Sequence, residues 1–127
     1  MYRTFNRILA GFALATSLSF AQSSTALSGT VYDPSGAVVA GAGVSVANEG
    51  TGNVLKQPTN SAGLFSFQSI PVGTYSVTVE MSGFKTVKRT GLTLVVNTPT
   101  QENITLELGQ STDVVSVEAT AAPINTE

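Results

Sequence analysis

One segment of the chain matches a nucleophilic motif. Ser82-Gly83-Phe84-Lys85 fits the S-x-x-K pattern of serine acyl enzymes. In those enzymes the lysine lies one helical turn from the serine, whereas here Gly83 follows a segment with strand periodicity. The partner motifs S-D-N and K-T-G do not occur in the sequence. We therefore interpret residues 82–85 as a hairpin bend and expect no enzyme activity from them.

Two pairs of residues with side-chain oxygens are candidate calcium ligands. Asp33 stands near Ser35, and Glu49 stands near Asn53. A calcium ion takes about six to eight oxygen ligands, usually from several carboxylates. The acidic residues of this chain are scattered singly, so we expect Asp33 to cap a turn and Glu49 to be solvated. We expect no cofactor and no metal.

Composition removes several classes of chemistry. The 127 residues include no Cys, no His and no Trp, so disulfides, thiolate chemistry, Cys/His metal sites and imidazole catalysis are excluded. Lys and Arg number 6 against 8 Asp and Glu, which leaves no electrostatic footprint for nucleic acid. Lys85, Lys88 and Arg89 form a small basic cluster. On a strand, Lys85 and Arg89 would share one face, and we expect a solvated sheet edge there.

The first 21 residues have the pattern of a secretory signal peptide. Arg3 and Arg7 precede an apolar run over residues 8–20, and Ser19 and Ala21 place small residues before a cut at Gln22. The alternative is an uncleaved anchor, but as a helix the run would span only about 20 Å. We predict export to the periplasm, with association to the outer membrane or secretion. Cleavage would leave four basic and eight acidic residues, a net charge of −4.

The remainder of the chain reads as short strands, and the chemistry-bearing residues lie in the turns between them. Apolar residues alternate with hydroxyl-bearing ones, and turn signals recur about every 8 to 12 residues. We predict an all-β fold, a seven-stranded sandwich of two sheets, with no helix after residue 21. The pattern gives seven or eight strands, and the candidate ranges are 27–32, 42–47, 54–59, 65–68, 75–81, 84–90, 92–97 and 103–108. Pro58 favours a sheet edge for the third, and the polar 84–90 segment suggests another edge.

Aromatic residues and turn residues suggest how the sandwich is held. We expect Phe65, Phe67, Tyr75 and Phe84 to dominate a thin core. Tyr75 follows a corner made by Pro71 and Gly73, and its hydroxyl could bond upstream backbone as in a tyrosine corner. The turn glycines expected to serve the fold are Gly36, Gly63 and Gly83.

After Gly109 the texture of the sequence changes. Residues 111–120 have strand character but stand apart from the other expected strands. We therefore expect an isolated strand, followed by a tail of small and polar residues. The predicted organisation is a signal peptide over 1–21, a leader over 22–25, a β-sandwich over 26–108 and a linker or tail over 109–127.

Three stretches resemble the carboxypeptidase regulatory-like domain. The resemblance implies a transthyretin-like sandwich, grouped with carbohydrate-binding-like folds, and it covers residues 27 to about 108. The stretches are Gly29-Thr30-Val31-Tyr32-Asp33-Pro34-Ser35-Gly36 with Ala40-Gly41-Ala42-Gly43-Val44, Thr59-Asn60-Ser61-Ala62-Gly63-Leu64-Phe65-Ser66-Phe67, and Ile70-Pro71-Val72-Gly73-Thr74-Tyr75-Ser76-Val77-Thr78-Val79 with Gly83-Phe84-Lys85.

The order of segments is similar to the N-terminus of a TonB-dependent, Oar-like outer-membrane receptor. The resemblance implies a non-catalytic periplasmic accessory domain, and we expect this chain to be a fragment or truncated relative, since no plug or barrel follows. Envelope proteins, namely TonB or the receptor's own plug or barrel, are the implied partners. One stretch is similar to the box that pairs with TonB, with a plain linker as the alternative. It consists of Asp113, Val114, Val115, Ser116, Val117, Glu118 and Ala119.

A second function remains open. Tyr32, expected to be exposed, could stack on a sugar ring, which would make the chain a secreted carbohydrate-binding module with a polysaccharide partner. Membership in a carbohydrate-binding-like fold is only an analogy for that function.

Overall fold

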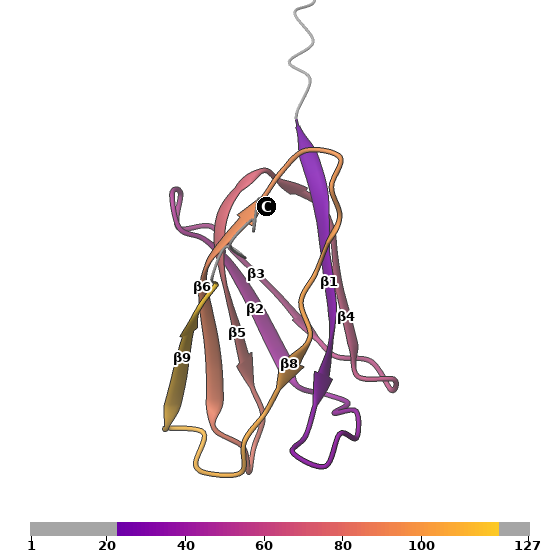
Figure 1. Cartoon of the computed structure of the whole chain (residues 1–127), viewed down its shortest axis with the longest axis vertical. Coiled ribbons are helices and arrows are strands. Elements are labelled where there is room, and N and C mark those ends of the chain that lie inside the picture. Colours follow the sequence, from indigo (N-terminus) through magenta and orange to yellow (C-terminus); the bar gives the residue numbers. More distant parts are fainter. Residues whose placement is uncertain (1–22, 120–127) are drawn as a thin grey trace, which may run out of the picture.

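The computed structural model describes residues 23–119, which form nine β-strands in two facing sheets (Figure 1). None of the described residues forms a membrane-crossing helix. The all-β prediction and the two-sheet sandwich are confirmed for this part of the chain. The predicted signal peptide, Gln22 of the leader and residues 120–127 of the predicted tail lie outside the described residues.

The first sheet is built around the long opening strand. β1 (Ser24–Tyr32) pairs antiparallel with β4 (Leu64–Pro71) on one side. On its other side lie two short parallel strands, β7 (Thr100–Gln101) and β8 (Ile104–Thr105). The strand predicted over residues 103–108 is therefore paired as a strand only at Ile104 and Thr105, although the Leu106 N–H still donates to the Tyr32 carbonyl at 2.8 Å.

The second sheet has the strand order β3-β2-β5-β6-β9. These strands are β3 (Val54–Pro58), β2 (Gly43–Asn48), β5 (Gly73–Glu80), β6 (Thr86–Leu94) and β9 (Val114–Glu118). Neighbours pair antiparallel except β6 and β9, which are parallel. The prediction that the strand carrying Pro58 lies at a sheet edge is confirmed, and all of β3 is exposed.

The core lies between the sheets, where the alternating apolar side chains meet. β5 shows the pattern most clearly, because Tyr75, Val77 and Val79 are buried while the residues between them are not. Phe65, Phe67 and Tyr75 are core residues as predicted. Phe84 is only partly buried and packs against the core from the bend after β5, so its expected dominance is wrong. Aliphatic side chains, Leu27 and Ile70 among them, fill most of the remaining space.

Two bulges explain where the predicted strand boundaries fail. The register of β5 and β6 shifts between Tyr75 and Val77, where Gly91 has φ 73°. The extra residue reverses the alternation phase, so the predicted 84–90 and 92–97 segments are one continuous strand through Leu94. A similar shift opposite Ala26 reverses the phase of β4, which therefore runs beyond the predicted 65–68 segment.

The sheet edge predicted at residues 84–90 is wrong, and so is the isolation of the 111–120 strand. β9 lies beside β6, at the left of Figure 1. The pairing is parallel and reaches across a long connection, and such a partner leaves no local signal in the sequence.

Candidate functional site

The S-x-x-K residues lie in a tight bend after β5. The Phe84 N–H donates to the Met81 carbonyl at 3.1 Å, and Gly83 has φ 86°. The Lys85 ammonium lies 3.5 Å from a Glu107 carboxylate oxygen in an ion pair. The hairpin interpretation of residues 82–85 is therefore confirmed by the geometry.

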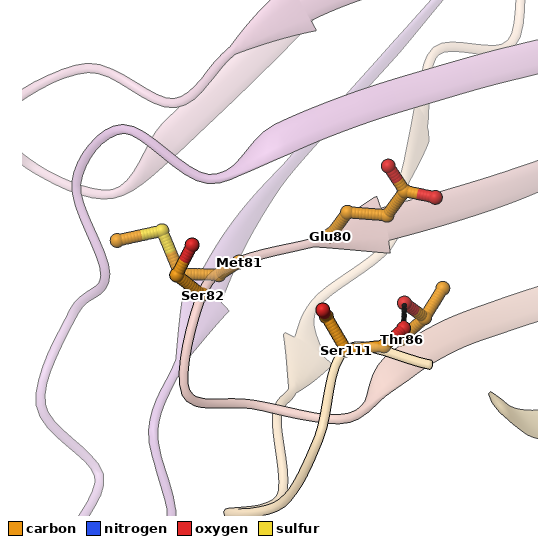
Figure 2. Close-up of a pocket in the computed structure, with 5 residues that line it drawn as sticks. All are labelled: Glu80, Met81, Ser82, Thr86 and Ser111. Atoms are coloured by element: carbon orange, nitrogen blue, oxygen red, sulfur yellow. Dashed lines mark hydrogen bonds between the residues drawn. The ribbon is translucent and has the colours of Figure 1, made fainter. Parts of the chain in front are cut away.

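Ser82 lines a shallow polar depression of about 320 Å³. Figure 2 shows the Glu80 carboxylate and the side chains of Met81, Ser82, Thr86 and Ser111 around it. The Thr86 hydroxyl is committed to the Ser111 carbonyl at 2.7 Å. Within residues 23–119 no group of three or more His, Cys, Asp or Glu residues gathers that could hold a metal ion. The depression thus offers one carboxylate and scattered hydroxyls.

Asp33 caps its own turn, as the sequence predicted. Its Oδ1 accepts hydrogen bonds from the Ser35 hydroxyl at 2.6 Å, the Ser35 N–H at 2.9 Å and the Ala37 N–H at 3.0 Å. The hydrogen bond from the Ser35 side chain is the main cause that lowers the pKa of Asp33 below its ordinary value. Gly36 completes the turn at φ 86°.

The Glu49 carboxylate makes a specific hydrogen bond. Its Oε1 accepts the Gly91 N–H at 2.9 Å, which ties the loop after β2 to the bulge in β6. The prediction that the Glu49 carboxylate is only solvated is therefore wrong. The bulge turns the Gly91 N–H outward, and the ladder between β5 and β6 does not use this donor.

Tyr32 ends β1 and is half-buried, so the expected exposed ring is wrong. It forms an isolated bridge with Val38, and its strand partner is Thr105. Part of the side chain remains accessible at this end of the sandwich.

The corner before β5 has the geometry that the sequence predicted. The Tyr75 hydroxyl donates to the Pro71 carbonyl at 2.7 Å, and the ring is buried. Gly73 adopts φ 151°. Gly63 sits at φ 71°, where an added Cβ would meet the Val38 Cβ at 2.8 Å. Tyr75, Gly73 and Gly63 therefore have structural roles.

The close packing around Gly29 was not predicted from the sequence. Gly29 lies in the middle of β1, where a Cβ would fall 1.8 Å from the Glu102 carbonyl oxygen and 2.6 Å from the Phe65 ring. A strand glycine can mark a close backbone approach, and this was the only available signal.

The basic cluster is not the solvated edge that was expected. Arg89 reaches the opposite sheet and contacts the Glu102 carboxylate at 2.7 Å, with 33% and 17% of the two side chains exposed. The prediction that Lys85 and Arg89 share a face agrees with these contacts, since both pair with carboxylates around β8. Lys88 is exposed on the other face.

The stretch from Asp113 to Ala119 is the remaining candidate, and it is docked. Five consecutive residues, 114–118, pair with residues 86–90 of β6. The Thr86 N–H donates to the Asp113 carbonyl at 2.9 Å, and the Ala119 N–H donates to the Thr90 carbonyl at 2.9 Å. These two hydrogen bonds hold the strand at its ends.

Two of the four exposed side chains of β9 are valines, and the other two are Ser116 and Glu118. Val114 is 59% exposed and Val117 is 39% exposed, while Val115 is half-buried against the sandwich. β9 is also the last strand of its sheet, so its far side has no partner in the described part of the chain. The arrangement can add a strand through backbone hydrogen bonds.

Comparison with known proteins agrees with the sandwich architecture. A family model of the carboxypeptidase regulatory-like domain matches residues 26–107. No match was found among curated protein sequences.

Several solved structures share the fold at low identity. The Bacillus anthracis TIE protein has a TM-score of 0.56 and 20% identity, over 68% of this chain and 17% of its own. A candidate carbohydrate-binding protein of Bacteroides uniformis has a TM-score of 0.54 and 17% identity, over 65% and 41%. The 5-hydroxyisourate hydrolase of Klebsiella pneumoniae has a TM-score of 0.52 and 24% identity, over 66% and 91%. This chain thus spans less than half of the first two proteins.

Proposed function

The chain belongs to the carboxypeptidase regulatory-like domain family, and we propose that it is a non-catalytic accessory domain that makes protein contacts in the bacterial envelope. Its place would be the N-terminus of a TonB-dependent outer-membrane receptor. The observation that carries this proposal is β9, an apolar strand at the open end of a five-stranded sheet.

A non-catalytic role is supported by what the reactive groups do. Lys85 is paired with Glu107, Asp33 is engaged by its turn and Ser82 sits in an exposed bend. The likeness to 5-hydroxyisourate hydrolase and to dioxygenases extends to the fold, and fold does not carry chemistry with it.

Export and the receptor context are part of the proposal. They are supported by the signal-peptide pattern of residues 1–21 and by the order of segments. In this setting Asp113–Ala119 would be the partner-pairing stretch, and TonB or the plug or barrel of the receptor would be its partner.

Crosslinking in living cells tests the proposal. A photoreactive amino acid placed at Val114 or Val117 should capture an envelope protein. The same group at Leu55, which is 37% exposed on β3, is the matched control because it also lies on an edge strand. Mass spectrometry would identify the captured protein. Equal yields from β9 and β3, or capture of no envelope protein, would contradict the proposal.

A carbohydrate-binding module is the second candidate. It is favoured by the shared fold with the Bacteroides uniformis protein and by the accessible part of Tyr32. Saturable retention on insoluble polysaccharide that is lost in Tyr32→Ala would support it, and retention unchanged in that variant would remove Tyr32 from consideration.

A further inference from the structure

Most edges of the sandwich are protected against an added strand. β3 carries Lys56 and Pro58. β4 has a bulge at Ser69, whose φ is 55°, and ends at Pro71. β7 and β8 are two residues long. Charge, proline, bulges and shortness are the devices by which proteins prevent edge pairing.

β9 has only one of these devices, the charge of Glu118 at its last residue. Its five residues, VVSVE, include no proline and no lysine, and its pairing with β6 has no register shift. Two of its three valines are exposed. Figure 1 shows it as the outermost strand beside β6. A regular edge of this length with a single charge at one end is suited to strand addition.

The backbone N–H and C=O groups of β9 point alternately toward β6 and away from it. In a parallel ladder alternate residues direct both backbone groups to the same neighbour. The bonds from Thr86 to Asp113 and from Ala119 to Thr90 set the phase, so odd-numbered residues face β6. The N–H and C=O groups of Val114, Ser116 and Glu118 therefore face outward.

We propose that this outer edge binds an extended segment of a partner protein while β9 remains docked on β6. The inference rests on the proposed function and specifies how the pairing stretch is engaged. The domain presents the strand with one side already satisfied, so the partner would extend the sheet from five strands to six.

The charges and side chains of β9 describe the partner segment. Asp113 and Glu118 lie at its two ends, and exposed valines lie between them. A short β-branched segment with a Lys or Arg at each end complements both features. A second copy of β9 fits less well, because antiparallel pairing centred on Ser116 would set Val114 against Glu118 twice.

A synthetic peptide tests the edge directly. The probe is Lys-Val-Thr-Val-Thr-Lys, whose lysines have the same five-residue spacing as Asp113 and Glu118, and its control has Glu at both ends. In an NMR titration the amide signals of Val114, Ser116 and Glu118 should shift, and their hydrogen exchange should slow. The Glu-ended peptide should bind at least several-fold more weakly. Shifts elsewhere with none in β9 would overturn the proposal.

One pair of variants isolates the backbone contribution. Ser116→Pro removes an outward N–H that the ladder with β6 does not use, while Ser116→Ala keeps it. We expect about tenfold weaker peptide binding for the proline variant and little change for alanine. Unchanged exchange at Lys88 and Thr90, whose N–H groups face β9, would show that β9 is still docked. Equal binding by both variants would contradict strand addition.

A disulfide separates docked binding from release. The chain has no Cys, so Lys88→Cys with Ser116→Cys, which are register partners, gives a single defined bond. Oxidised and reduced forms should bind the probe equally. Loss of binding only on oxidation would overturn the docked mode and leave the proposed function standing, whereas failed crosslinking in cells would count against that function. Dimerisation abolished by Ser116→Pro would make a second copy the occupant and overturn the partner assignment.

Discussion

Gly29→Ala is the substitution whose loss of folding stability follows most directly from the structure. The new Cβ would lie 1.8 Å from the Glu102 carbonyl oxygen, only about half of an ordinary van der Waals separation. Because this neighbour is backbone, a rotamer change cannot relieve the overlap. The 100–103 segment must move away from β1 by more than an ångström.

That movement strains two hydrogen bonds. The Glu102 N–H donates to the Ser28 carbonyl at 2.8 Å, and the Thr30 N–H donates to the Asn103 side chain at 3.1 Å. Overpacking costs about 1–3 kcal/mol and each lost hydrogen bond about 1 kcal/mol, so we expect about 3–5 kcal/mol. A domain of this size has about 5–15 kcal/mol of stability in total.

Urea unfolding followed by far-UV circular dichroism measures the effect. With an m value of about 2 kcal/mol/M, the midpoint should fall by about 2 M. Gly43→Ala is the matched control, because it also lies in a strand but its Cβ would meet only the Glu80 carbonyl oxygen at 3.7 Å. We expect it to stay within about 0.5 kcal/mol of the wild type. Equal midpoints for the two variants would refute the reasoning.

Three further changes probe other contacts. Tyr75→Phe removes the hydrogen bond to Pro71 and should cost about 1 kcal/mol in chemical unfolding; no change would mean that the corner is held by packing alone. Because the pKa of Asp33 is lowered from 3.8 in the folded state, its contribution is present above that value and lost as pH falls through the folded pKa. Thermal melts of Asp33→Asn and wild type should therefore converge below about pH 3.8, and a constant gap would contradict this. Glu102→Gln leaves the partly exposed Arg89 without its carboxylate and should cost about 1 kcal/mol, less in high salt; a salt-independent loss would point to packing instead.

The sandwich itself was predictable because its signals are local. Side chains alternate across a strand with a period of two, so the buried faces of β1, β2 and β5 can be recognised from sequence. The turns at Gly36 and Gly63 need positive φ, and the structure has 86° and 71° there. The bond from Tyr75 to Pro71 spans only four residues.

Where the alternation changes phase, the prediction failed. The bulge at Gly91 places Arg89 and Leu92 on the same inner face, although they are three residues apart. A period-two pattern reads such a change as the end of a strand. The bulge at Ser69 had the same effect on β4.

The sequence alone determined that residues 113–119 favour an extended strand, and it determined the apolar faces, the turns and the absence of Cys and His chemistry. Only the tertiary structure decided that this strand pairs with β6, that Arg89 meets Glu102 and that Gly29 has no room for a methyl group. The reason is physical. Strand propensity and alternation depend on a residue and its immediate neighbours, whereas a parallel partner and a close backbone approach depend on where distant segments come to lie.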